Sequence, residues 1–189
     1  MPRKENNQFF KEQIEKFGTD VKGVNWGSKE SQEKRFEIIK EYLPKSGSLV
    51  DAGCGFGDFY KFLQNEDIDY LGIDVSDEMV QKAKELYPKA KFKKKDILND
   101  DLPKADIYIA SGSLNILTYQ ETYSFIKNCF SSSKNMFIFN ILSTHSDFYN
   151  KGYNYFSPTE LLAYCMSLTN KIILRHDYMP HDFTIVMYK

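Results

Sequence analysis

Three glycines follow a buried strand at every second position in the segment Val50-Asp51-Ala52-Gly53-Cys54-Gly55-Phe56-Gly57. Glycine adopts backbone angles that other residues avoid, and it lets a ligand touch the main chain. The run Ser48-Leu49-Val50-Asp51 is typical of a buried parallel strand. A dinucleotide-binding fingerprint, G-x-G-x-x-G, requires a further glycine where this chain has Asp58, so the strict pattern fails. The segment therefore predicts a strand-to-helix turn that can hold a ligand.

Strands and helices alternate along the chain outward from this turn. Further strands are predicted over residues 70–74, 90–95, 106–110 and 136–142, and helices over 8–17, 30–43, 58–64, 76–87, 119–130 and 158–168. Two final β-type runs, 171–175 and 183–188, are joined by residues 176–182 and predict an antiparallel hairpin at the sheet edge. The pattern predicts an α/β fold, a doubly wound, mostly parallel seven-stranded sheet that ends in an antiparallel hairpin, with helices on both faces.

Length, charge and cysteine usage indicate one ordinary globular domain. The 189 residues contain no repeat, so we expect a single domain over 1–189, with N-terminal helices or a lid in 1–45 and the core in 46–189. The net charge of -1 favours neither nucleic acid nor an anionic membrane. The N-terminus has no apolar run of a signal peptide, and no stretch approaches the roughly 18 apolar residues of a membrane span. Three widely spaced cysteines argue for a reducing cytoplasm, and against disulfides or zinc.

Acidic residues end the two strands that follow the glycine turn. Asp74 ends the predicted strand 70–74, and Asp96 follows the strand that ends at residue 95. Ligands of doubly wound sheets bind beyond the carboxyl ends of the strands, beside the first strand. A carboxylate at Asp74 can accept two hydrogen bonds from ribose hydroxyls there.

The acidic residue Asp51, followed by G-x-G-x-G, resembles motif I of the class I S-adenosylmethionine-dependent methyltransferases. The resemblance covers about residues 24–189, and it implies a Rossmann-like core, S-adenosylmethionine as cofactor and methyl transfer to a small-molecule acceptor. The cofactor contacts that we expect are Trp26, Arg35, Asp51, Gly53, Cys54, Gly55, Gly57, Asp74, Val75, Asp96, Ile97 and Ser111.

The resemblance also implies roles for some of these residues. An aspartate at the position of Asp96 accepts from the adenine amino group, and the next residue, Ile97, packs on the ring. The family places its methyl-facing motif in the segment that begins at Ser111. Some small-molecule members carry a tryptophan and an arginine before motif I, as Trp26 and Arg35 stand here, and the arginine meets the methionine carboxylate.

A general base is needed only if the acceptor is a hydroxyl or a protonated amine. His145 is the candidate, because it lies in the loop after the strand 136–142, and such loops face the methyl group; His176 and His181 are alternatives. The aromatic residues of 149–156 either wall a substrate pocket, with cation–π contact to the sulfonium, or simply pack under a long loop.

Missing features narrow the acceptor. Ser111-Gly112-Ser113-Leu114 stands where enzymes that methylate nucleic-acid bases carry an Asn-Pro-Pro-Tyr-like segment, and no carboxylate cluster suggests a magnesium site. We therefore expect a small-molecule acceptor, no metal, no nucleic-acid or membrane partner, and a monomer or homodimer. Two alternatives remain: a non-catalytic module that binds the cofactor, and, less favoured by Asp58 and the terminal hairpin, a nicotinamide-dependent oxidoreductase.

Overall fold

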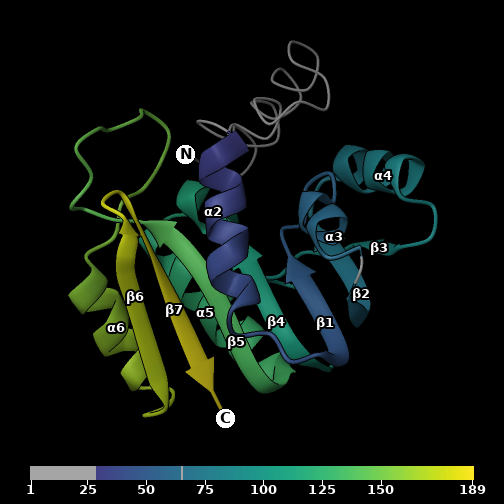
Figure 1. Cartoon of the computed structure of the whole chain (residues 1–189). Helices are drawn as coiled ribbons and strands as arrows, with labels where there is room; N and C mark the ends of the chain where they lie inside the picture. The colour runs from purple at the N-terminus through teal and green to yellow at the C-terminus, as the bar shows by residue number, and fades with distance from the viewer. Residues whose placement is uncertain (1–28, 65) are drawn as a thin grey trace.

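The computed structural model describes residues 29–64 and 66–189 of the chain (Figure 1). The strands are β1 (Ser46–Ala52), β2 (Asp67–Asp74), β3 (Lys91–Lys94), β4 (Ala105–Ser111), β5 (Ser133–Leu142), β6 (Ile172–Met179) and β7 (Asp182–Tyr188). The helices are α2 (Lys29–Lys40), α3 (Asp58–Phe62), α4 (Asp77–Leu86), α5 (Tyr119–Ser132), α6 (Pro158–Met166) and the 3₁₀ turn η2 (Ser113–Ile116). The predicted helix over 8–17 and Trp26 lie outside the described residues.

The strands form one seven-stranded sheet in the order β3-β2-β1-β4-β5-β7-β6. β1 pairs in parallel with β2 and β4, and the parallel pairing continues to β3 on one side and to β5 on the other. β7 runs antiparallel to both β5 and β6. The predicted fold class is therefore confirmed, and Figure 1 shows that the hairpin places β6, not the last strand, at the edge.

The connection predicted over residues 176–182 is wrong. β6 continues to Met179 and β7 begins at Asp182, so only Pro180 and His181 join the two strands. An irregularity in the pairing between Arg175 and Met179 takes up the extra residues of β6. Polar residues resemble a loop in the sequence, but an edge strand accommodates them because its outer side faces solvent.

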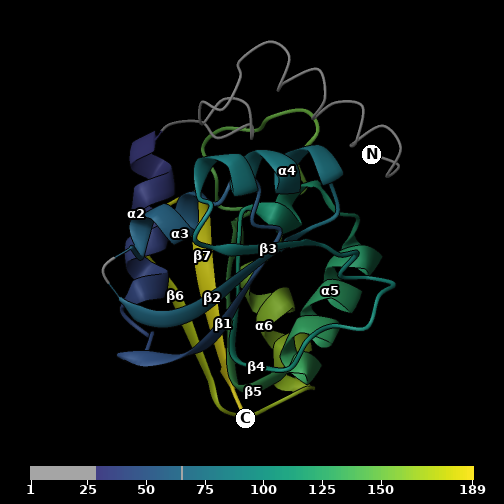
Figure 2. The ribbon, with the colours of Figure 1, turned by 90° about the vertical axis from the view of Figure 1, so that its right-hand side faces the viewer.

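Helices cover both faces of the sheet: α2 and α3 lie on one side, and α5 and α6 on the other (Figure 2). Side chains of a strand alternate between faces, and β4 shows this directly. Ile107 and Ile109 belong to the core cluster that contains Phe36 of α2, whereas Tyr108 and Ala110 pack in the cluster on the α5 side. Because both faces are buried, the strand has the continuous apolar character that marked it in the sequence.

Side-chain caps start the helices where the sequence predicted them. Ser76 precedes α4, and its hydroxyl accepts a hydrogen bond from the Met79 backbone at 3.2 Å. Ser157 caps α6, with Pro158 at its first helical position. A capping box of Thr118 and Glu121, not predicted, starts α5. Each cap satisfies backbone donors that have no partner within the helix.

Neither membrane-spanning helices nor metal clusters occur in the part of the chain that the structure describes. No helix there combines the length and hydropathy that crossing a bilayer requires. No three histidine, cysteine, aspartate or glutamate side chains gather there in a way that could hold a metal ion.

A buried ion pair ties α2 to β7. Arg35 Nε donates to Asp182 Oδ2 at 2.7 Å, and the two side chains are only 5% and 0% exposed. The Tyr178 hydroxyl donates to Asp182 Oδ1 at 2.6 Å, so both carboxylate oxygens have a donor. Burial raises the pKa of Asp182, and the positive charge of Arg35 opposes that shift.

We predict that Asp182→Ala lowers the free energy of unfolding by about 3–5 kcal/mol, because it leaves the Arg35 guanidinium buried without its counter-charge. Urea denaturation followed by circular dichroism measures the change. Asp177→Ala is the matched control, because it removes an aspartate from an arginine on the exposed part of β6 and should change stability little. Equal losses in the two variants would show that burial does not set the strength of the Arg35 pair.

Candidate functional site

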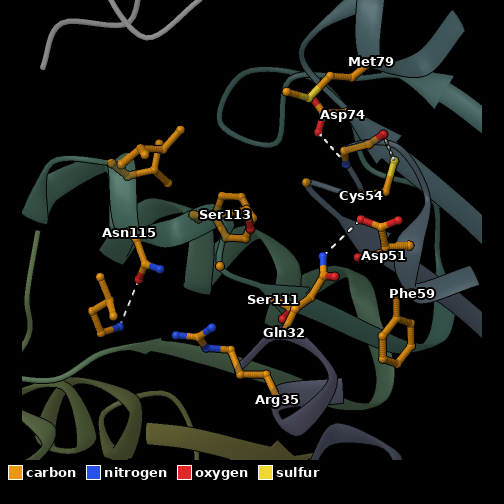
Figure 3. Close-up of a pocket in the computed structure, with 18 of the residues that line it drawn as sticks. Gln32, Arg35, Asp51, Cys54, Phe59, Asp74, Met79, Ser111, Ser113 and Asn115 are labelled. Carbon is orange, nitrogen blue, oxygen red and sulfur yellow. Dashed lines mark hydrogen bonds between the residues drawn. The ribbon is translucent and has the colours of Figure 1, made fainter. Parts of the chain in front are cut away.

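A pocket of about 410 Å³ opens at the carboxyl ends of β1, β2 and β4, beside the first strand (Figure 3). Its walls come from α2, the β1–α3 turn, the ends of the central strands, η2 and the loop after β5. Small-molecule sites occupy about 300–1,000 Å³, so the pocket has the size of a ligand site. It lies at the sheet edge where the sequence predicted one.

Most of the site residues named from the sequence line this pocket. They are Arg35, Asp51, Gly53, Cys54, Gly55, Asp74, Val75, Asp96, Ile97 and Ser111. Gly57 and His145 are not among the lining residues, and Trp26 lies outside the described residues. The fold thus brings the predicted set together, while the contact of each residue with a ligand stays a prediction.

Packing explains two of the three glycines of the turn. Gly53, Gly55 and Gly57 have φ angles of 80°, 52° and 84°, which residues with a Cβ rarely adopt. A Cβ on Gly53 would lie 2.4 Å from the Ser113 Cβ, and one on Gly57 would lie 2.8 Å from the Phe92 ring. Gly57 therefore serves the packing of α3 against β3, and Gly53 lets η2 approach the turn.

Asp74 connects the end of β2 to the glycine turn. Its Oδ2 accepts from the Gly55 backbone at 3.0 Å, and its Oδ1 accepts from the Ser76 backbone at 2.9 Å. Burial raises the pKa of Asp74, and these backbone hydrogen bonds oppose the shift. A carboxylate oxygen has two lone pairs, so each oxygen can still accept from a donor in the pocket.

Asp96 and Ile97 place a carboxylate beside an apolar surface at the end of β3. Asp96 Oδ1 accepts from the Leu98 backbone at 3.0 Å, and its Oδ2 accepts from the Asn99 amide at 2.8 Å. Ile97 is buried next to it. The pair combines a fixed acceptor with a surface on which a flat ring can pack.

The end of β4 is tied to the neighbouring strand and loop. Ser111 Oγ donates to Asn140 Oδ1 at 3.0 Å. The Leu142 backbone donates to Asn115 Oδ1 at 2.9 Å (Figure 3). The backbone of Asn154 donates to the carbonyl of Asn115 at 2.7 Å, which fastens the loop after β5 to η2. Asn115 belongs to the segment that begins at Ser111, in which the resemblance places the methyl-facing motif, but its contacts with Leu142 and Asn154 join distant segments and could not be predicted from the sequence.

The sequence analysis missed Gln32. This side chain lines the pocket from α2 and donates to Asp58 Oδ2 at 3.0 Å. Gln32 and Arg35 are three residues apart, so they share one face of the helix. That spacing was a usable signal, because a buried polar face on a helix indicates a site.

Acidic side chains outnumber basic ones among the described residues that line the pocket. Asp51, Asp58, Asp74 and Asp96 line it, whereas Arg35 is the one lysine or arginine among its described lining residues. Arg35 reaches the pocket from α2 (Figure 3), and its Nη1 donates to Ser31 Oγ at 2.9 Å. The arrangement favours a ligand with positive charge and one anionic group.

Asp51 is a buried carboxylate with an unusual protonation equilibrium. The Tyr70 hydroxyl donates to its Oδ2 at 2.7 Å. Burial raises the pKa of Asp51 to about 7, the charges of Asp74 and Asp58 add to the rise, and the hydrogen bond from Tyr70 opposes it. Asp51 therefore changes protonation near neutral pH.

The histidines and Cys54 differ in their access to the pocket. His145 is exposed, and its ring lies 5.6 Å from that of His176. His181 lines the pocket, with its ring 4.9 Å from Phe148. Cys54 is buried, and burial raises the pKa of its thiol well above the usual range. The thiol stays protonated and is a packing group rather than a nucleophile.

We predict that Asp51→Asn becomes increasingly more stable than the parent protein as the pH rises from about 4 to 7, by up to about 4 kcal/mol. The folded parent protein retains the Asp51 proton in this range, where the unfolded chain loses it, so its stability falls as the pH rises. Urea denaturation of the ligand-free proteins at a series of pH values measures the difference. Tyr70→Phe should move the upper limit of the window to higher pH, because it removes the hydrogen bond that favours the carboxylate. Parallel stability curves for Asp51→Asn and the parent protein would contradict the assignment.

Comparisons with known proteins agree with the geometry of this site. A family model described as a methyltransferase domain matches residues 49–135, which run from the first strand through the glycine turn to β5. Rv1506c of Mycobacterium tuberculosis, a protein named as a methyltransferase, is 31% identical over 157 residues, which are 75% of this chain and 93% of that protein. Relatives from Invertebrate iridescent virus 6 and Nautilia profundicola are 32% and 28% identical, and the matched segments span 38% and 50% of their lengths.

Solved structures share the whole fold at low sequence identity. The DhpI complex with S-adenosylhomocysteine (SAH) has a TM-score of 0.77 at 13% identity, over 97% of this chain and 94% of that chain. Magnesium protoporphyrin IX methyltransferase from Synechocystis PCC 6803, with bound SAH, has a TM-score of 0.64 at 16% identity, over 84% of this chain and 81% of that chain. The strand order, the glycine turn, the family match and the match to 93% of the length of Rv1506c agree with one another. This chain therefore belongs to the class I S-adenosylmethionine-dependent methyltransferases.

Proposed function

We propose that this enzyme transfers the methyl group of S-adenosylmethionine to a hydroxyl or amino group of a small molecule, in the pocket at the carboxyl ends of the strands. Asp74 carries the cofactor assignment, because it is buried at the end of β2 and lines the pocket with acceptor capacity left on both oxygens. In this proposal the ribose hydroxyls donate to Asp74. The alternative function, a nicotinamide-dependent oxidoreductase, has less support, because Asp58 stands where its fingerprint requires a glycine.

The other cofactor contacts follow from the neighbours of Asp74. We assign the adenine to Asp96 and Ile97, which offer a fixed acceptor next to an apolar surface. The glycine turn lets the cofactor approach the backbone, and Arg35 faces the methionine carboxylate. The carboxylates of the pocket suit a cofactor that carries a sulfonium and an ammonium group. The cofactor contacts of Gly57 and Trp26 stay predictions. Trp26 lies outside the described residues, and Gly57 packs against the Phe92 ring.

Residues of this chain have few chemical tasks in such a reaction. The bound cofactor supplies an already activated methyl group, so the protein aligns the acceptor and excludes water. We assign the acceptor to the part of the pocket that is lined by Asn115, Ile116, Leu142, Phe148, Tyr153 and His181, and we call this part the acceptor side. Hydrogen bonds from Asn154 to Asn115 and from Phe156 to Leu142 hold the loop over this side.

Pocket size and charge support a small acceptor. The cofactor and the acceptor share about 410 Å³, and the apolar wall of Ile116, Leu142 and Phe148 leaves little room for a polymer. The net charge of -1 gives no attraction for nucleic acid. The names of two similar structures point the same way: one methylates magnesium protoporphyrin IX, and DhpI was solved with both SAM and HEP.

We also propose that residues 1–189 act as one domain in the cytoplasm, as a monomer or homodimer, with N-terminal helices or a lid in 1–45 and the core in 46–189. The position of α2 supports this division, because its residues Gln32 and Arg35 line the pocket while β1 begins the core at Ser46. Three buried free cysteines are consistent with a reducing compartment.

Isothermal titration calorimetry with S-adenosylmethionine, S-adenosylhomocysteine and NADH tests the ligand class. We expect binding of both sulfur ligands and none of NADH; a preference for NADH would contradict the proposal. Radiolabelled methyl transfer to the small-molecule fraction of a cell extract, followed by product identification, tests the reaction. Binding without transfer to any fraction would favour the non-catalytic alternative.

We predict that Asp74→Ala and Asp74→Asn weaken S-adenosylhomocysteine at least about tenfold, because each removes charge-assisted hydrogen bonds to the ribose. Calorimetry measures the affinity, and circular dichroism checks that the variants fold. Asp69→Ala is the matched control, since Asp69 lies on the same strand with an exposed side chain paired to Lys91. An unchanged affinity in both Asp74 variants would refute the ribose assignment.

A further inference from the structure

The turn between β6 and β7 carries His181 to the acceptor side of the pocket. The turn consists of Pro180 and His181 alone, and Asp182 next to it forms the buried ion pair with Arg35. The carbonyl of His181 accepts from the Ser143 backbone at 3.0 Å, which ties the turn to the end of β5. The backbone position of His181 is therefore fixed by its own carbonyl and by the buried side chain of the next residue, Asp182.

The imidazole ring of His181 is held by packing while its nitrogens remain available. Phe148, from the loop after β5, lies 4.9 Å from the ring centre. Among the described residues, no group forms a hydrogen bond to the ring nitrogens of His181, whereas His176 Nε2 lies 3.1 Å from the Pro180 carbonyl. A half-buried ring in a pocket, without a protein partner, is arranged to meet a ligand.

The charges around His181 favour its neutral form. Partial burial lowers the pKa of His181 below its usual value, and the positive charge of Arg35 lowers it further. Asp182 and Asp147 act in the opposite direction without reversing the shift. The neutral imidazole has a nitrogen lone pair at neutral pH, which is what a base requires.

We propose that His181 is the general base of the methyl transfer, and that the acceptor is therefore a group that must lose a proton, a hydroxyl or a protonated amine. This inference rests on the proposed function. The acceptor oxygen or nitrogen forms its new bond to the methyl carbon, and the electron pair of the broken carbon–sulfur bond stays on sulfur. The proton of the acceptor passes to a ring nitrogen of His181, and from there to water, since the ring is partly exposed.

Other groups are less suited to this role. His145, the candidate from the sequence, lies in the loop after β5 as predicted, but it is exposed and does not line the pocket. The carboxylate of Asp51 already accepts from Tyr70, and Asp182 is paired with Arg35. Asp182 is not among the residues that line the pocket, and Asp51 lies next to the glycine turn, on the side that we assign to the cofactor.

The test compares His181→Gln with His145→Gln in the full chain, using the methyl acceptor that the extract screen identifies. We expect His181→Gln to lower kcat about 100-fold or more, to keep the affinity for S-adenosylhomocysteine within twofold, and to abolish the acidic limb of the pH–rate profile. Added imidazole should partly restore the rate of His181→Ala. A merely structural role would produce neither the lost limb nor the rescue. Full activity of His181→Gln, or loss of the limb in His145→Gln instead, would overturn the proposal.

A second measurement needs no acceptor, so it separates this proposal from the proposed function. The chain has three histidines, and their imidazole nitrogens can be titrated one by one by nuclear magnetic resonance in the S-adenosylhomocysteine complex. We expect the pKa of His181 to lie below that of an ordinary histidine, because the ring is partly buried and faces the positive charge of Arg35. A His181 ring that is protonated at pH 7 in this complex would overturn the proposal, even where the cofactor binds as expected. Absence of S-adenosylhomocysteine binding would instead contradict the proposed function.

Discussion

Parallel pairing of β1 with strands on both sides is the constraint on which the rest of the structure depends. β1 pairs with β2 along Ser46–Ala52 and with β4 along Leu49–Asp51, so the three strands end at one edge of the sheet. The glycine turn, Asp74 and Ser111, which line the pocket, are attached to those ends. Parallel strands require crossover helices, and these helices bury both faces of the sheet. The same connectivity that builds the core therefore places Asp51, Asp74 and Ser111 beside one another.

The site concentrates charges that a purely structural core would avoid. Asp51, Asp74 and Asp182 are all buried, and burial raises the pKa of each. Hydrogen bonds from Tyr70, from backbone amides and from Arg35 offset part of the desolvation cost. Buried carboxylates of this kind cluster at functional sites, because a bound cation can stabilise the ionised form that the empty fold disfavours. Their number here agrees with a cofactor that carries positive charge.

The Arg35–Asp182 pair gives the two ends of the chain a common role in the pocket. Arg35 comes from the first described helix and Asp182 from the last strand, 147 residues apart. The pair brings α2 against the sheet, and it holds the β6–β7 turn in which His181 stands. The pair thus contributes to the stability of the fold and to the positions of two pocket residues, Arg35 and His181. Because His181 lies in the turn of the terminal hairpin, this hairpin lines the pocket and also completes the sheet.

Local patterns in the sequence were enough to predict the sheet, most of its boundaries and the sheet edge at which the pocket lies. Apolar runs marked β1, β4 and β5, and the glycines of 53–57 marked the turn, because backbone conformation and strand burial depend on neighbouring residues. The polar second half of β6 resembles a loop in the sequence, since an edge strand carries no continuous apolar pattern. The ion pair of Arg35, the role of Asn115 and the pocket position of His181 rather than His145 were decided only by the tertiary structure. Each depends on contacts between segments far apart in the chain, and no local spacing of residues encodes which of three histidines a folded loop will bring to the pocket.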